Sequence, residues 1–174
     1  MEKPGATLFM FSGLSGVGKT TLARALAAHL RVAYLRIDTV EQALRDLCGF
    51  KVEGEGYRLA YRIAAENLRL GLDVVADCVN PVTLTRDEWG AVAHAEGARI
   101  CNIEVLCSDP DEHRQRVEGR ANDIAGLALP GWNEVMQREF HAWRENRLRI
   151  DTARRGVAES LAELLRRLPQ ARQS

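Results

Sequence analysis

The sequence predicts a three-layer α/β fold in which helices cover both faces of a five-stranded parallel sheet. Short apolar runs without helical period, which are typical of buried strands, alternate with amphipathic stretches of ten or more residues. Because a parallel strand pair needs a long crossover connection, this alternation favours a parallel sheet. A length of 174 residues with 46% hydrophobic and 28% charged content fits a single domain over residues 1–174.

The strands and helices are expected in a regular order along the chain. Strands are expected at residues 6–12, 32–37, 72–76, 100–107 and 148–151. Helices are expected at residues 20–30, 39–48, 57–70, 132–143 and 157–168. Two more helices carry start signals: Thr85 and Glu88 form a capping box for one, and Asp109 followed by Pro110 begins the other. Ligands of such sheets bind beyond the carboxyl ends of the strands.

The charge balance excludes several classes of partner. Lysine and arginine number 24, as do aspartate and glutamate, so the formal charge is zero, which argues against a broad surface for nucleic acid. No apolar run approaches the roughly 20 residues of a membrane span, and residues 1–6 lack a secretory signal pattern. We therefore expect a cytoplasmic protein without a membrane partner. The four cysteines form no Cys-x-x-Cys pair, so we expect reduced thiols, mostly in the core.

A phosphate-binding loop follows the first expected strand. Residues 13–20 read GLSGVGKT and fit the pattern G-x-x-x-x-G-K-[ST] between a strand and a helix. Glycines let successive backbone N–H groups turn toward an oxyanion, and the helix amino terminus adds roughly half a positive charge. Lys19 is expected to reach the β- and γ-phosphates, and the Thr20 hydroxyl to ligate Mg²⁺. The residues expected to bind the nucleotide are Gly13, Ser15, Gly16, Val17, Gly18, Lys19, Thr20 and Thr21.

On this loop and its context, the chain resembles the small P-loop kinases of the nucleoside-monophosphate-kinase-like group. Within that group it looks like the branch of polynucleotide-kinase-type, chloramphenicol-phosphotransferase-type, zeta-toxin-type and gluconate-kinase-type domains. The resemblance covers nearly the whole chain, from the first strand through the arginine-bearing segment after the fourth. It implies a P-loop NTPase fold with strand order 2-3-1-4-5, and ATP with Mg²⁺ as the phosphoryl donor.

Two carboxylates follow expected strands. In the resembling kinases, an aspartate at the place of Asp38 acts as a base or binds the acceptor hydroxyl; the alternative is a helix cap, and both roles can coexist. Asp77 resembles the acidic residue that touches Mg²⁺ through water or orients the acceptor, whereas the alternative is a turn or capping residue. Asn80 is a candidate substrate contact, although Asn-Pro is also an ordinary turn dipeptide.

The residues that would select a substrate give weaker signals. Polynucleotide-kinase-type members tend to carry an arginine, which holds a substrate phosphate, where this chain has Glu41. This departure from their pattern favours a hydroxylated or cationic small molecule over nucleic acid as the substrate. Arg58 and Arg62 interleave with Tyr57 and Tyr61 at helical spacing, a pattern that fits an acceptor pocket or, alternatively, a packed helix face with exposed basic ends.

Residues 110–131 are expected to form a small lid, because residues 121–131 show no apolar period. Arg116 and Arg120 are four residues apart and are expected to share a helix face. Lid arginines in the resembling kinases stabilise the transferring phosphoryl group, a contribution that reaches about 10³-fold or more. A solvated charged face is the alternative for both side chains.

Together these residues predict an ATP-dependent kinase that phosphorylates a hydroxyl group of a small molecule. Asp38 would act as the base, with Lys19, Arg116 and Arg120 around the transferring charge, and Thr20 with Asp77 would bind the metal. A polynucleotide 5'-kinase is the alternative enzyme. A nucleotide-dependent switch is the non-catalytic alternative, although the chain lacks a guanine-reading N-K-x-D motif.

Overall fold

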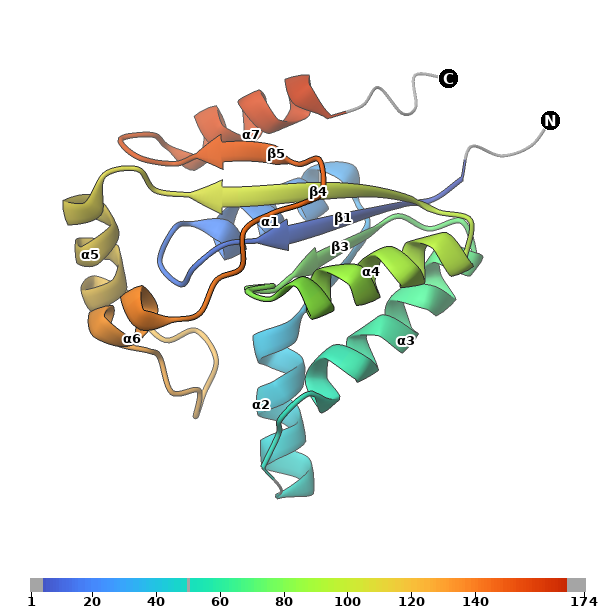
Figure 1. The fold of residues 1–174 in the computed structure, drawn as a ribbon, viewed down its shortest axis with the longest axis horizontal. Coiled ribbons are helices and arrows are strands. Elements are labelled where there is room, and N and C mark those ends of the chain that lie inside the picture. Colours follow the sequence, from blue (N-terminus) through green and yellow to red (C-terminus); the bar gives the residue numbers. More distant parts are fainter. Residues whose placement is uncertain (1–4, 50, 169–174) are drawn as a thin grey trace.

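Five parallel strands form one sheet in the order β2-β3-β1-β4-β5, as the sequence predicts. The computed structural model describes residues 5–49 and 51–168 (Figure 1). The strands are β1 (Thr7–Ser12), β2 (Ala33–Arg36), β3 (Val74–Asp77), β4 (Arg99–Leu106) and β5 (Leu148–Asp151). The helices are α1 (Lys19–Leu30), α2 (Ile37–Cys48), α3 (Glu55–Arg69), α4 (Thr83–Ala95), α5 (Pro110–Gly119), α6 (Trp132–Gln137) and α7 (Val157–Arg167).

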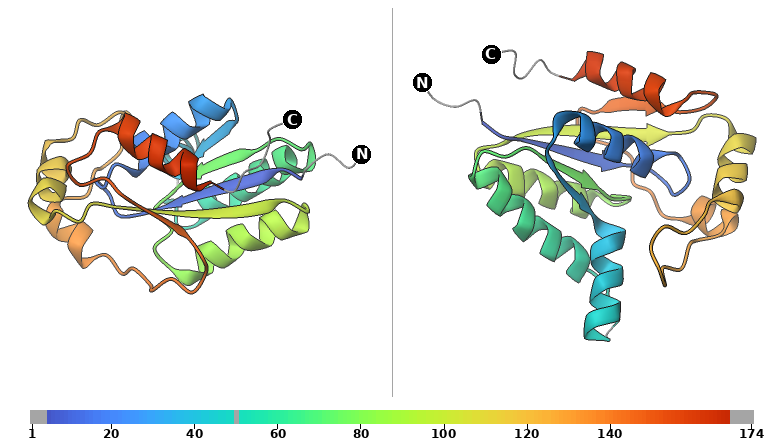
Figure 2. Two further views of the ribbon diagram at one scale, coloured as in Figure 1. Left: turned by 90° about the horizontal axis from the view of Figure 1, so that it is seen from above. Right: turned by 180° about the vertical axis from the view of Figure 1, so that it is seen from behind.

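The central strand β1 divides its side chains between two apolar layers. Phe9 and Phe11 pack with residues of α1 and α7 on one face of the sheet. Leu8 and Met10 pack with residues of α3 and α4, the helices that cover the other face in Figure 2. All four side chains are buried, which explains why β1 reads as a continuous apolar run rather than an alternating one. The predicted three-layer architecture is therefore confirmed.

The predicted start of α4 and the predicted end of α6 are both wrong, and Arg86 of α4 contacts the segment that follows α6. α4 begins at Thr83, and the Thr85 hydroxyl donates to the carbonyl of Val82, so Thr85 is not the cap. Arg86 in this helix is buried, and its guanidinium donates to the carbonyls of His141 and Ala142 at 3.0 and 3.3 Å. α6 ends at Gln137 instead of continuing to residue 143, and His141 and Ala142 beyond it hydrogen-bond to α4 and to the turn before α4.

The four cysteines, which all lie within the described residues, are free thiols. Cys78 and Cys101 are buried and Cys107 is half-buried, but Cys48 is exposed at the end of α2. In Figure 1, α2 extends away from the sheet, which leaves its last turn without a neighbouring layer. None of the described helices has the length and apolar content needed to cross a membrane.

Candidate active site

A cavity of about 960 Å³ lies between the loop of residues 13–20, the start of α2, α5 and the segment that follows α5. Most of the predicted site residues meet there. Those that line the cavity are Ser15, Gly16, Gly18, Lys19, Thr20, Thr21, Asp38, Glu41, Arg116 and Arg120. Gly13, Val17, Arg58, Arg62, Asp77 and Asn80 are not among the residues that line it.

The loop of residues 13–20 is pressed against β4 and α5 so closely that glycine is required. A β-carbon on Gly13 would lie 2.3 Å from the carbonyl oxygen of Val105 in β4. Gly16 has a φ of +85°, and a β-carbon there would lie 2.4 Å from the Cγ2 atom of Val117 in α5. α1 begins directly after Gly18, so the first turn of α1, with its free N–H groups, lies at the cavity. This is the geometry of an anion-binding P-loop.

Lys19 is paired with Asp77 beneath the loop. Its Nζ atom lies 2.5 Å from Oδ1 of Asp77, and the Tyr34 hydroxyl donates to Oδ2 of the same carboxylate at 2.7 Å. Burial alone would raise the pKa of Asp77, which is 1% exposed, but the charge and hydrogen bonds of Lys19 and Tyr34 outweigh it and lower that pKa. Burial and the adjacent carboxylate raise the pKa of Tyr34. Asp77 is therefore an ionised group behind Lys19 rather than in the cavity wall.

Asp38 lies in the first turn of α2 and not at a strand end, because β2 passes into α2 without an intervening loop. Its side chain is 43% exposed and lines the cavity. The capping alternative is not observed, since Arg36 occupies the cap position of α2 without a side-chain hydrogen bond to the helix. One turn later, Glu41 is paired with Arg45 at 3.3 Å, and burial raises the pKa of Glu41.

The two lid arginines have different surroundings. Arg116 donates to the hydroxyl and to the carbonyl of Thr152, which follows β5, at 2.8 and 3.0 Å. Arg120 lies just past the end of α5 and donates to the carbonyl of Pro130 at 2.8 Å, so the predicted shared helix face is wrong. Burial lowers the pKa of Arg120, while the negative charge of Asp38 opposes that shift. Of the two lid arginines, Arg120 is therefore the one on the Asp38 side of the cavity.

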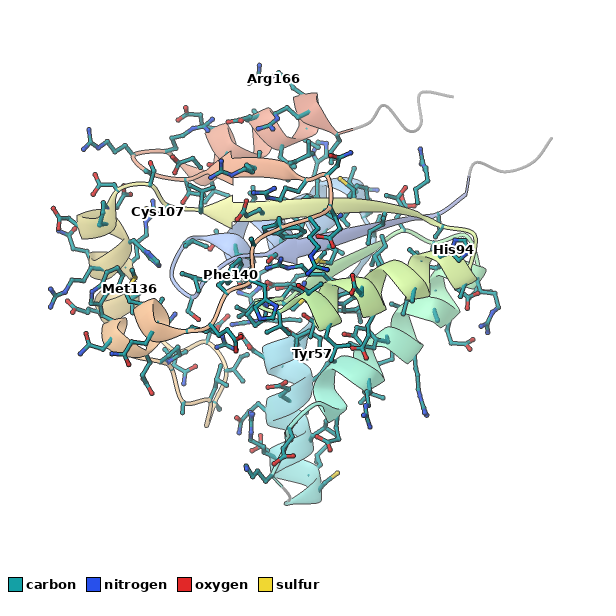
Figure 3. The ribbon with its side chains drawn as sticks, in the orientation of Figure 1. Tyr57, His94, Cys107, Met136, Phe140 and Arg166 are labelled. Atoms are coloured by element: carbon teal, nitrogen blue, oxygen red, sulfur yellow. The ribbon has the colours of Figure 1, made fainter. Side chains whose placement is uncertain are left out.

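Asn80, Arg58 and Arg62, three predicted substrate contacts, lie away from the cavity lining. Asn80 is buried in a turn with a φ of +46°, and its amide donates to the carbonyl of Phe11 at 2.9 Å. Arg58 and Arg62 are exposed on α3, which agrees with the alternative of a packed helix face with exposed basic ends. On α3 it is Tyr57, labelled in Figure 3, that lines the cavity.

The sequence did not single out three residues that shape the site. His113 in α5 is buried, and its Nε2 donates to the carbonyl of Ser15 at 2.8 Å, which fixes the lid helix to the P-loop. Asp123, in the segment after α5, forms ion pairs with Arg24 at 2.7 Å and Arg36 at 2.8 Å. The position of Arg36 beside Asp38 is a signal that could have identified it. Asp123 lies in a stretch without period and offered no comparable signal.

Comparisons with known proteins identify the family. A family model described as an AAA domain matches residues 8–138. The chain belongs to this AAA domain family. A "probable adenylyl-sulfate kinase" from Pseudomonas aeruginosa is 29% identical over 176 residues, which cover 96% of this chain and 78% of the relative.

Two solved structures share the fold. An APS kinase of Mycobacterium tuberculosis, in complex with AMPPNP and APS, has a TM-score of 0.67 at 19% identity and covers 94% of this chain and 97% of that chain. A gluconokinase from Sinorhizobium meliloti has a TM-score of 0.60 at 19% identity and covers 95% of this chain and 94% of that chain. The resemblance to small P-loop kinases is thus confirmed for the fold, and the expected donor, ATP with Mg²⁺, agrees with these relatives. The particular branch stays a prediction.

Proposed function

We propose that this protein is an ATP-dependent kinase that transfers the γ-phosphate to a hydroxyl group of a small molecule. The observation that carries this proposal is that a P-loop with Lys19 and the carboxylate of Asp38 share one cavity. Phosphoryl transfer needs these parts near each other, because the donor phosphates must be held while an acceptor hydroxyl is oriented. The kinase activities named for the relatives support the same reaction class.

The residues present fit ATP and Mg²⁺. The backbone of the P-loop and the start of α1 would hold the phosphates, and AMPPNP, named in the M. tuberculosis structure, is an ATP analogue. The Thr20 hydroxyl would bind Mg²⁺, with the ionised Asp77 behind it. When bound, Mg²⁺ supplies positive charge to the phosphate oxygens.

Side chains of the protein accept the proton, stabilise the transferring charge and exclude water. A carboxylate oxygen of Asp38 accepts the proton of the acceptor hydroxyl as the hydroxyl oxygen attacks the γ-phosphorus; the bond from the γ-phosphorus to the β,γ-bridging oxygen breaks, and ADP leaves. Lys19 leaves Asp77 for the phosphate oxygens, and Tyr34 continues to donate to the Asp77 carboxylate. Arg120 lies on the Asp38 side and stabilises the transferring charge, whereas Arg116 holds the loop after β5 against the P-loop side. Residues 110–131 act as the lid that excludes water from this cavity.

The test is the substitution Asp38→Asn, measured as ADP release and phosphorylated product over a panel of hydroxylated small molecules. We expect kcat to fall by about 10²-fold or more because the base is lost, while the affinity for ATP measured by calorimetry is unchanged. Asp46→Asn is the matched control, because Asp46 lies on the same helix but outside the cavity lining. Equal turnover in wild type and Asp38→Asn would refute the mechanism.

A further inference from the structure

We propose that the acceptor carries an anionic group, a phosphate or a carboxylate, which binds Arg36 and Arg24 in place of Asp123. This inference rests on the proposed kinase function and adds the chemical class of its substrate. The evidence is the arrangement of charges at the α2 side of the cavity. Arg36 ends β2, Arg24 belongs to α1, and Asp123 comes from the segment after α5.

Arg36 is a buried cation with unused hydrogen-bonding capacity. Its side chain is 9% exposed and lines the cavity. Its Nη1 atom donates to Asp123 at 2.8 Å, but its Nε atom has no hydrogen-bond partner among the described residues. Oδ2 of Asp38 lies 3.8 Å from Nε of Arg36, which is beyond hydrogen-bonding distance. A guanidinium in which one Nη atom donates and Nε does not can bind a carboxylate or phosphate that accepts from both Nε and Nη.

Asp123 occupies the place that such an anion would take. One of its carboxylate oxygens, Oδ2, is shared between Arg24 and Arg36, and the side chain is 43% exposed. The hydrogen bond and charge of Arg36, together with Arg24, lower the pKa of Asp123 to about 2, so it is an anion at neutral pH. The pair with Arg24 is exposed on both sides and contributes little, and the Asp123 carboxylate is itself open to water, which can hydrate it when it leaves Arg36. An anionic substrate can therefore replace it without leaving Arg36 unpaired.

The remaining charges of the cavity favour the same class. Among the described residues that line it, seven are arginine or lysine and four are aspartate or glutamate. Glu41, which the sequence associated with a cationic substrate, is already paired with Arg45. Since Arg36 also lies beside Asp38, an anion bound at Arg36 would hold the rest of the acceptor next to the proposed base.

The test is calorimetric titration of the whole protein, saturated with a non-hydrolysable ATP analogue and Mg²⁺ so that the P-loop is filled. The titrants are D-ribose 5-phosphate, D-gluconate and inorganic phosphate, compared with the neutral sugars D-ribose and D-glucose. We expect at least one organic anion to bind with one site per protein and at least tenfold more tightly than its neutral counterpart. Arg36→Gln should weaken that binding at least tenfold, and Asp123→Asn should strengthen it several-fold because the competing carboxylate is gone.

Arg114→Gln removes the same charge from an exposed position on α5 and is the matched control. Thermal unfolding of each variant verifies that it is folded, and the opposite direction expected for Asp123→Asn keeps the test decisive if Arg36→Gln is unstable. Anion binding that is the same in Arg36→Gln and Arg114→Gln, or that is undetectable for every anion, would overturn the inference. Because no phosphate is transferred in this assay, intact anion binding without later phosphorylation would count against the kinase proposal alone.

Discussion

The contact between the P-loop and α5 allows a sharp test through Gly16→Ala. The φ of +85° costs a residue with a β-carbon about 1–2 kcal/mol. The new methyl group would also lie 2.4 Å from Cγ2 of Val117, a short and buried side chain, and such overpacking costs about 1–3 kcal/mol. We therefore expect Gly16→Ala to lower the free energy of unfolding by about 2–5 kcal/mol.

Gly18→Ala is the matched control, because its φ of +89° is similar but its nearest neighbour is a Thr152 methyl carbon at an ordinary 3.6 Å. It should lose only the backbone contribution of about 1–2 kcal/mol. Urea unfolding without nucleotide measures both variants. The overpacking also predicts that Val117→Ala offsets part of the Gly16→Ala loss, with a favourable coupling of about 1–3 kcal/mol in a double-mutant cycle. Equal losses in the two glycine variants and no coupling to Val117 would refute the described contact.

Three further outcomes follow from buried or paired charges. Arg86→Lys should lower the free energy of unfolding by about 3 kcal/mol in urea titrations, since lysine cannot reproduce the hydrogen bonds to four carbonyls. Asp123→Asn should cost at most about 1 kcal/mol at neutral pH, because the Asp123 carboxylate is 43% exposed to screening solvent and the amide oxygen of asparagine can still accept from Arg36. The folded pKa of about 2 lies below the ordinary 3.8, so this difference should be present above pH 4 and vanish as the pH falls toward 2 in urea unfolding. Tyr34→Phe removes the donor to Asp77 and should raise several-fold the Mg²⁺ concentration that half-saturates ATP consumption, with the acceptor KM unchanged.

The parts of this protein that the sequence predicts are those set by local pattern and chain topology. The P-loop motif is contiguous, and the strand order agrees with the resemblance implied by that motif. Asp38 and Arg120 reach the same cavity because α2 and α5, which carry or precede them, follow β2 and β4 at the carboxyl edge of the sheet. Such placements need no knowledge of side-chain packing.

The errors and omissions arise from contacts between residues distant in sequence and from the exact ends of helices. Arg86 has the pattern of a solvated helix residue, yet residues 140–143 cover it: its guanidinium donates to the carbonyls of His141 and Ala142 and lies over the rings of Phe140 and Trp143. The ion pair between Arg36 and Asp123 joins positions 87 residues apart, and neither lies in a periodic stretch that would bring them together. Arg120 leaves the helix face of Arg116 because α5 ends one residue earlier, at Gly119.

Net charge is the least informative of the sequence quantities for choosing a substrate. A formal charge of zero governs the long-range field, and it excludes a broad basic surface of the kind that tracks a nucleic acid backbone. A small acceptor instead experiences charges within a few ångströms, where salt screens them little. In this chain those charges include Arg36, which is buried with an unused donor, and Glu41, whose charge Arg45 compensates. The same neutral chain therefore disfavours nucleic acid at its surface and favours a small anion in its cavity.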